Sequence, residues 1–314
     1  MNNLIFCLNA TIPIFLTMLL GVFFRYAGLL DQSFVNKMNR FVFTAAIPAL
    51  LFHDLSGVPF RQVWDSRFVL FCFLTTAVCI AICCGLSFFV ADRSIRGEFA
   101  QAGYRSSATI LGISLIQNLY GNAGMAPLMI VSSVPLYNAA AVLILELMGP
   151  DRKRPDRETL NKTLKNLLTN PIILGIGAGI LWSLSGLSQP RIMELTVKNL
   201  AATATPLGLM VMGASFDAGK TLKKWRPVLA ASALKLVGFT AVFLPLAVRM
   251  GFHDDKLVAI LVMLGSSTTV SCFVMARGMG HDGTVTAGAI MLTTFFSAFT
   301  LTVWLFILRS MGLI

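Results

Sequence analysis

The stretch PIFLTMLLGVFFRYAGLL, residues 13–30, has a counterpart in PIILGIGAGILWSLSGLS, residues 171–188, and this pair decides the fold. The two leading prolines are 158 positions apart. Three further pairs have the same spacing: Gly21 and Gly179, Gly28 and Gly186, and Pro48 in IPALLF and Pro206 in TPLGLM. These coincidences predict that the second half of the chain repeats the first, against the alternative of chance in a sequence rich in glycine and proline.

The composition around this repeat argues strongly against a water-soluble enzyme. Of the 314 residues, 56% are hydrophobic and 12% are charged, whereas a soluble domain carries about 25% charged residues. The mean hydropathy is +0.78. A disordered chain and a secreted disulfide scaffold are disfavoured on the same grounds. The lipid bilayer is the solvent that suits such a chain.

Charge and cysteine usage point the same way. The net charge of +11 comes from basic residues that stand mostly in short segments between apolar runs. This pattern is typical of membrane topology and not of nucleic-acid binding, because no basic stripe alternates with aromatic residues. The six cysteines lie in apolar stretches without CxxC or metal-ligand spacing. We therefore expect no disulfide, no metal and no cofactor.

A membrane-spanning helix needs about 20 mostly apolar residues. The sequence predicts ten such spans, at residues 8–30, 35–56, 68–91, 101–120, 124–148, 167–187, 193–216, 227–249, 255–277 and 284–308. The first span lacks a basic region before it, so we expect it to remain as a helix and not to be cleaved as a signal peptide. The strongly polar segment 149–166 divides the chain into repeats 1–148 and 167–314. Because five helices is an odd number, the second repeat must be inverted relative to the first, as in many secondary transporters.

The distribution of cations predicts the orientation. Alternate connections, starting after the first span and including the 149–166 segment, carry 17 Lys and Arg residues, against seven on the opposite side. The positive-inside rule then places the 149–166 segment in the cytoplasm and both termini outside. Arg105 is counted among these flanking cations.

Two spans in corresponding places of the repeats are poor continuous helices. The fourth reads YRSSATILGISLIQNLYGNAG, and the ninth reads VMLGSSTTVSCFVMARGMG. Serine, threonine and glycine favour non-helical backbone, which membranes tolerate only where protein buries it or it lines a watery cavity. The alternative is that these hydroxyls bond to their own helix. For the matched pair we favour breaks whose half-helix N-termini bind an anion without a buried arginine.

Two other features have a structural interpretation. Lys235 lies about 12 Å into the eighth span, from where it can snorkel to the cytoplasmic interface or act as the counter-charge of an anionic substrate. We favour snorkelling. Gly175 and Gly179 form a GxxxG motif, which we interpret as helix packing. The sequence has no nucleotide-binding glycine loop, HExxH motif or nucleophile elbow, so no enzyme activity is predicted.

Three segments carry a family resemblance over essentially the whole chain. NRFVFTAAIPALLF, NPIILGIGAGILWSLSGL and ATPLGLMVMGASF resemble the auxin efflux carrier family, whose bacterial members are often named malonate or organic-acid permeases. The resemblance implies an all-helical membrane protein of ten helices in two inverted repeats. It further implies a scaffold of helices 1, 2, 6 and 7, and a transport domain of helices 3–5 and 8–10 with helices 4 and 9 broken where they cross. Organic anions would move by an elevator-like motion, and a homodimer fits the plant members.

The sequence departs from the family pattern at the crossing. The fourth helix of the family usually reads N-x-G-x-x-G-x-P, whereas here Ser107, Thr109 and Ser114 replace the asparagine, the first glycine and the proline. In the ninth helix the expected proline falls on Ser267. A break without proline must rely on glycine and serine.

These observations predict a secondary transporter for a small organic anion, a mono- or dicarboxylate such as malonate, with the lipid bilayer as its other partner. A membrane sensor that binds without transport, and an anion channel, are the alternatives. The residues expected to bind substrate are Gly112, Ser114, Asn118, Gly265, Ser266, Ser267, Thr268, Thr269 and Ser271. Supporting roles are assigned to Ser107, Pro48, Pro206 and Lys235.

Overall fold

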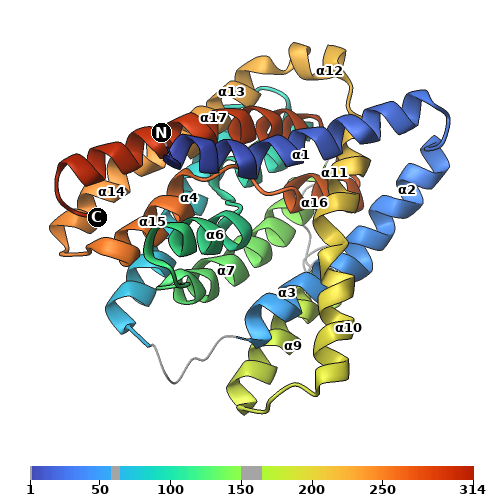
Figure 1. Cartoon of the computed structure of the whole chain (residues 1–314). Helices are drawn as coiled ribbons and strands as arrows, with labels where there is room; N and C mark the ends of the chain where they lie inside the picture. Colours follow the sequence, from blue (N-terminus) through green and yellow to red (C-terminus); the bar gives the residue numbers. More distant parts are fainter. Residues whose placement is uncertain (1, 58–63, 150–164) are drawn as a thin grey trace.

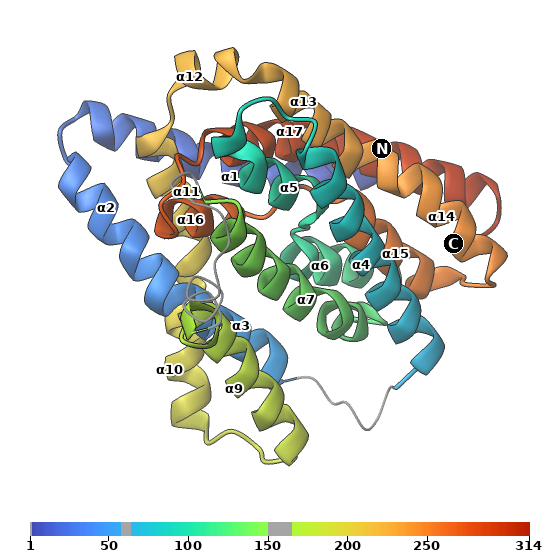
Figure 2. The ribbon, with the colours of Figure 1, turned by 180° about the vertical axis from the view of Figure 1, so that it is seen from behind.

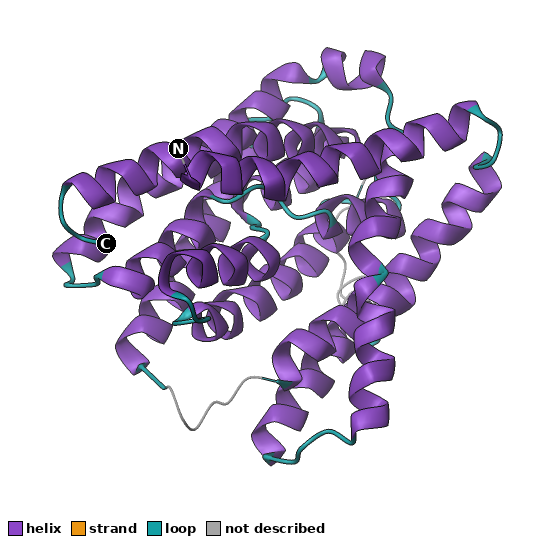
Figure 3. Cartoon of the chain, viewed as in Figure 1, coloured by secondary structure: helices purple, strands orange, loops and turns teal. Residues whose placement is uncertain are grey.

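The computed structural model describes residues 2–57, 64–149 and 165–314. At a few positions inside helices, including Gly112 and Ser114, it describes the backbone alone. Within these ranges all regular structure is helical, as Figure 3 shows, and no strand is present. The all-helical class predicted from the sequence is therefore correct. Most of the charged segment 149–166 lies outside the described residues.

Long helices without interruption form the first group of elements. They are α1 (Asn2–Tyr26), α4 (Ser66–Ser87), α7 (Ala126–Leu147), α9 (Pro171–Ser185) and α17 (Thr284–Ser310). In the described part of the chain, four helical segments are long and apolar enough to cross a membrane: α4, α7, α17 and the segment Trp225–Arg249. A part of α1, Ile12–Tyr26, and the whole of α9 are apolar but shorter. The count of ten spans stays a prediction.

Two long helical segments are irregular at a point that lies a few residues before a proline. Helix α2 (Gln32–Phe41) continues through the π-helical turn η1 (Val42–Ala46) into α3 (Ile47–Ser56). Helix α10 (Arg191–Ala202) is separated from α11 (Ala204–Ser215) by Thr203. Pro48 and Pro206 lie near the starts of α3 and α11. Because proline clashes with the carbonyl four residues earlier, it disturbs the helix at these points.

Helix α13 (Trp225–Ala233) runs through a second π-helical turn, η3 (Leu234–Gly238), into α14 (Phe239–Arg249). The turn η3 contains Lys235. The short helix α12 (Ala218–Lys223) precedes α13, and the Asp217 side chain caps the first turn of α12.

Two segments each consist of two α-helices separated by a few non-helical residues. Helix α5 (Arg96–Tyr104) is followed by α6 (Ala108–Tyr120), and α15 (Asp254–Gly265) is followed by α16 (Ser271–Gly278). The 3-10 turn η2 (Arg93–Ile95) leads into α5, and the Asp92 side chain accepts a hydrogen bond from Ser94 N–H at its start. The first of these segments therefore begins before residue 101, where the sequence predicts its start. This earlier start places Arg105 at the interruption and not beside a loop.

The helices pack in two groups (Figures 1 and 2). In one group α3 packs against α9 and α10, and α1 packs against α11. In the other, α4 packs against α5 and α7, and α13 packs against α17. Helix α15 is the centre of this second group, because every residue from Leu257 to Gly265 is buried. The second interrupted segment reaches the first group through α16, which packs against α11 and α2.

The GxxxG motif in α9 is a packing motif, as predicted. A Cβ on Gly175 would lie 2.7 Å from the Pro48 carbonyl oxygen, and one on Gly179 would lie 3.1 Å from Phe52 Cα. Glycine at these two positions lets α9 approach the backbone of α3.

Candidate functional site

The two interruptions cross and hold each other. The backbone N–H of Ser107 donates to the carbonyl oxygen of Ser267 at 2.9 Å, which joins the first break to the second. Arg105 and Ser266 both have extended backbone where their helices end. No proline takes part. The breaks are therefore stabilised by hydrogen bonds between two segments that are far apart in sequence.

The helices that enter the crossing are capped by side chains of the opposite segment. Ser106 Oγ donates to the carbonyl oxygen of Met263, near the end of α15. In the reciprocal contact, Thr268 Oγ1 donates to the carbonyl oxygen of Ala102 in α5 at 2.9 Å. The carbonyl groups at a helix end need such partners when they are buried. These two C-terminal ends are thus satisfied by the protein itself.

Lys235 also caps α15. Its side chain is 1% exposed, and Nζ donates to Ser106 Oγ and to the carbonyl oxygens of Met263 at 3.1 Å and Leu264 at 2.6 Å. The snorkelling that the sequence analysis favours is therefore wrong. A cation is stabilised at a helix C-terminus because the helix dipole is negative there, and these acceptors hold the ammonium group inside.

The helices that leave the crossing have no side-chain caps at their first turns, although in α16 the N–H groups of Cys272 and Phe273 already donate to the carbonyl oxygens of Thr269 and Val270. Ser107, at the N-cap of α6, and Val270, at the N-cap of α16, make no side-chain capping hydrogen bond. Both first turns line the pocket described next. A helix N-terminus carries unpaired N–H groups and the positive end of the dipole, so it suits an anion.

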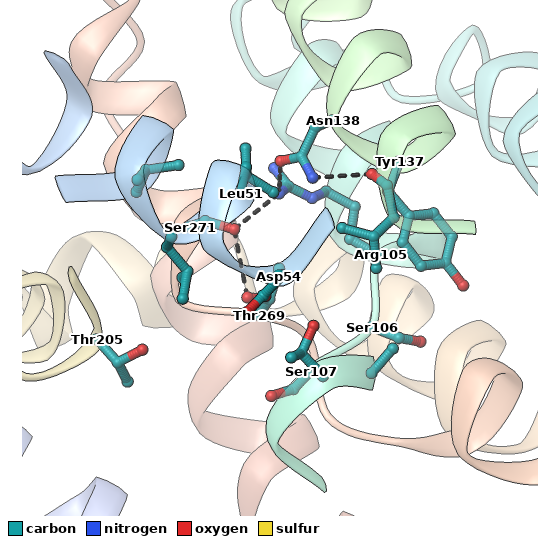
Figure 4. A pocket seen from close by; sticks show the side chains of 15 residues that line it. Leu51, Asp54, Arg105, Ser106, Ser107, Tyr137, Asn138, Thr205, Thr269 and Ser271 are labelled. Carbon is teal, nitrogen blue, oxygen red and sulfur yellow. Dashed lines mark hydrogen bonds between the residues drawn. The ribbon is translucent and has the colours of Figure 1, made fainter. Parts of the chain in front are cut away.

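A pocket in two adjoining compartments lies at the crossing (Figure 4). The Arg105 compartment has a volume of about 70 Å³, and its polar lining includes Asp54, Arg105, Thr109, Tyr137 and Asn138. The hydroxyl compartment has a volume of about 170 Å³, and its polar lining includes Ser267, Thr268 and Thr294. Six residues line both compartments: Ile47, Leu50, Ser107, Thr205, Thr269 and Ser271.

Arg105 is a buried cation whose partners are all neutral. Its side chain is 1% exposed. One terminal nitrogen donates to Asn138 Oδ1 at 2.6 Å and to Ser271 Oγ at 2.7 Å, as Figure 4 shows. The other contacts Gln101 Oε1 at 3.4 Å and Met275 Sδ at 2.8 Å, and Nε has no hydrogen-bond partner. A buried arginine therefore lines this pocket, which the sequence analysis did not expect.

Asp54 lines the same compartment from α3. Its carboxylate lies 3.5 Å from His53 Nδ1. No ion pair joins it to Arg105 among the ion pairs that the described residues form. The compartment thus has a positive group on the broken segment and a negative group on the facing helix.

The structure brings most of the predicted site residues together. Ser267, Thr268, Thr269, Ser271 and Ser107 line the pocket. Ser266 is buried with an unpartnered Oγ, and Gly265 ends α15 beside it. Pro48 and Pro206 each lie next to a lining residue, Ile47 and Thr205. Asn118 is exposed near the far end of α6. Gly112 and Ser114 lie within α6, where the structure describes the backbone alone.

Sequence reasoning missed eight polar lining residues: Asp54, Arg105, Ser106, Thr109, Tyr137, Asn138, Thr205 and Thr294. Arg105 directly precedes the SSAT run that drew attention to the fourth span, and this position was the available signal. Asn138 is a polar residue in the apolar helix α7, which is a further signal. No comparable signal in the sequence identifies Thr205 and Asp54, because their position at the crossing depends on how α11 and α3 pack.

The site can bind an anion but lacks the parts of a metal centre. No group of three His, Cys, Asp or Glu residues with metal-binding geometry is found among the residues that the structure describes. Free N–H groups, hydroxyls and a guanidinium group are donors, and donors bind carboxylates or other oxyanions.

Comparison with known proteins adds two findings. A family model described as "Membrane transport protein" matches residues 6–305. Over 309 residues the chain is 24% identical to a protein of Rhizobium meliloti (strain 1021) named "Putative malonate transporter", and the alignment covers 95% of each chain.

Proposed function

The chain belongs to the membrane transport protein family, the auxin efflux carrier family of the sequence analysis, and on that premise we propose that it is a secondary transporter for a small organic anion. It is an integral membrane transporter and not an enzyme. The proposed substrate is a mono- or dicarboxylate resembling malonate, which the name of the Rhizobium relative suggests.

The observation that carries the proposal is the crossing of the two interrupted segments. Their C-terminal ends are capped by Ser106, Thr268 and Lys235, whereas the N-terminal ends of α6 and α16 face a pocket. Irregular backbone at membrane depth is costly unless it lines a cavity, and positive helix ends recognise anionic groups in such carriers. The pocket is therefore proposed as the substrate site.

The proposed mechanism is an elevator-type motion. The scaffold would comprise α1, α2–α3, α9 and α10–α11, and the transport domain would comprise α4–α7 and α13–α17. The packing of α3 on α9 and of α1 on α11 supports this division, as does the position of the pocket between Ile47 or Thr205 on one side and the breaks on the other.

Two contacts support the proposed inverted repeat. Gly21 in α1 lies against the backbone of Met210, and Gly179 in α9 lies against the backbone of Phe52. Gly179 comes 158 positions after Gly21, and Phe52 comes 158 positions before Met210. The two contacts therefore correspond to each other under the spacing found in the sequence. The bends before Pro48 and Pro206 are also related by this shift.

The proposed orientation has the 149–166 segment in the cytoplasm and both termini outside. Because Arg105 is buried at the break, it no longer counts as a flanking cation, and the bias becomes 16 against seven. This bias still has the sign that the positive-inside rule requires.

Counterflow in proteoliposomes tests the function. Purified protein is reconstituted in vesicles loaded with unlabelled malonate, succinate or acetate, and uptake of the same labelled acid is followed. A carrier gives saturable uptake that the internal acid accelerates. Flux without saturation or counterflow would instead assign a channel, and binding without flux would assign a sensor. Vesicles with Ser267→Leu protein, which fills the crossing, are expected to lose uptake.

A further inference from the structure

Arg105 has no charged partner that explains its burial. A guanidinium group removed from water costs several kcal/mol unless an opposite charge or excellent hydrogen bonding compensates it. Its acceptors Asn138, Ser271 and Gln101 are neutral, and Nε lacks a partner. An arginine held in this way at a pocket wall is a receptor for an anionic group.

The pocket has a second place for an anionic group. The first turns of α6 and α16 meet at Ser107, Thr269 and Ser271, which line both compartments. Ser271 also accepts from Arg105. The guanidinium group is therefore adjacent to helix ends that have no side-chain cap, and a molecule with two negative groups joined by a short linker can reach both places.

Resting on the proposed transport function, we infer that Arg105 binds one carboxylate of a short dicarboxylate while the N-terminal ends of α6 and α16 bind the other. Arg105 is then the residue that makes the carrier prefer dicarboxylates to monocarboxylates. A monocarboxylate fills one of the two places and leaves the other charge uncompensated.

The contacts of Arg105 suit this role. Asn138 and Ser271 hold one terminal nitrogen at 2.6 Å and 2.7 Å, which fixes the guanidinium plane from α7 and α16. Both terminal nitrogens have acceptors in the protein, so the unpartnered Nε–H is the donor left for a carboxylate. A guanidinium group that is fixed in advance loses little entropy when it binds. Lysine at this position would offer a point charge without the Nε–H donor.

Asp54 provides an independent test of the same site. Its carboxylate lines the Arg105 compartment from the facing helix. A substrate carboxylate in that compartment is repelled by it, so removing its charge strengthens binding of the dicarboxylate. A ligand farther from Asp54 responds less, because the repulsion falls with distance.

The experiment measures binding of malonate and acetate to the full-length protein in nanodiscs by titration calorimetry, at one pH and ionic strength. The variants are Arg105→Gln, Arg105→Lys and Asp54→Asn. Arg93→Gln is the matched control, because Arg93 is exposed on η2 outside the pocket and the change in charge is identical. Size-exclusion profiles and thermal unfolding check that each variant is folded.

We expect Arg105→Gln to weaken malonate binding by about 10- to 100-fold, the range for a hydrogen-bonded charge, and acetate binding far less. The ratio of the acetate to the malonate dissociation constant therefore falls toward one. A general loss of structure would not change this ratio in the same way. Arg105→Lys restores part of the ratio. Asp54→Asn tightens malonate binding by about 3- to 30-fold, and Arg93→Gln leaves both constants unchanged.

The possible outcomes separate the inference from the function. If the wild-type protein transports carboxylates but Arg105→Gln keeps the wild-type preference for malonate, the inference is wrong and the transporter stands. If the wild-type protein neither binds nor transports any acid of the panel, both are overturned. If Arg105→Gln does not fold, Asp54→Asn decides: tighter malonate binding supports the site, and unchanged or weaker binding refutes it.

Discussion

Replacing Gly175 by alanine tests a close helix contact of the proposed scaffold, that of α9 with α3. An ideal Cβ on this residue would lie 2.7 Å from the carbonyl oxygen and 2.8 Å from the Cα atom of Pro48 in α3. Carbon atoms normally approach to about 3.5–4.0 Å. Helix α9 or α3 must therefore move by about 1 Å to admit a single methyl group.

The magnitude follows from two opposing terms. Overpacking of this kind costs about 1–3 kcal/mol, and alanine stabilises a helix by about 1 kcal/mol relative to glycine. We expect Gly175→Ala to destabilise the protein by up to about 2 kcal/mol. Gly177, two residues along the same helix, is the control, because a Cβ there meets no atom within 4 Å. Gly177→Ala is expected to stabilise the protein by about 0.5–1 kcal/mol.

The assay is thermal unfolding of the purified variants in one detergent, followed by tryptophan fluorescence. The opposite signs of the two alanine variants are the decisive feature, since a general effect of alanine on α9 would give one sign. The reasoning is refuted if Gly175→Ala unfolds at or above the wild-type temperature, or if the two variants shift it equally.

Three further predictions concern the caps and an ion pair. Glu98→Gln should lower stability by about 2 kcal/mol in thermal unfolding, because the buried carboxylate accepts N–H bonds from Gly283, Val285 and Thr286 at the start of α17; an unchanged midpoint would contradict this. Lys235→Met should cost about 1–3 kcal/mol, since it leaves the buried Leu264 carbonyl without its donor, and equal stability would rule out the capping role. The hydrogen bond from Lys256 Nζ, 2.6 Å away, holds the pKa of Asp65 below its usual value. The stability that Asp65 contributes is therefore complete above about pH 5 and is lost as the pH falls below about 4. Melting curves of Asp65→Asn and wild type should converge over that window, and a constant difference would refute the ion pair.

The sequence predicted the class of protein because composition and periodicity are local properties. An apolar chain with few charges has to form membrane helices, since the backbone must be hydrogen-bonded within each segment. The bends before Pro48 and Pro206 also follow from local chemistry. The positions of the breaks do not, because the hydrogen bonds that hold them join Ser106 to Met263 and Ser107 to Ser267.

The sequence predicted one part of the candidate site and missed another. The run Gly265–Ser271 was identified from its hydroxyls and glycine, which are rare in a lipid-facing helix, and four of its serine and threonine residues line the pocket. Arg105 was misassigned because its burial depends on where α5 begins, and Asp92 sets that start through the cap of η2. The sequence alone does not distinguish an arginine beside a loop from an arginine inside a helix break.

By itself, then, the sequence determined an all-helical membrane transporter, and it predicted a repeated half and a polar centre in the fourth and ninth segments. The tertiary structure alone decided which helix ends are capped, that Lys235 points inward, and that Arg105 and Asp54 face one pocket. The physical reason is that burial and pairing of a charge depend on groups brought together from distant parts of the chain, whereas hydrophobicity and helix breaking act within a few residues of each other.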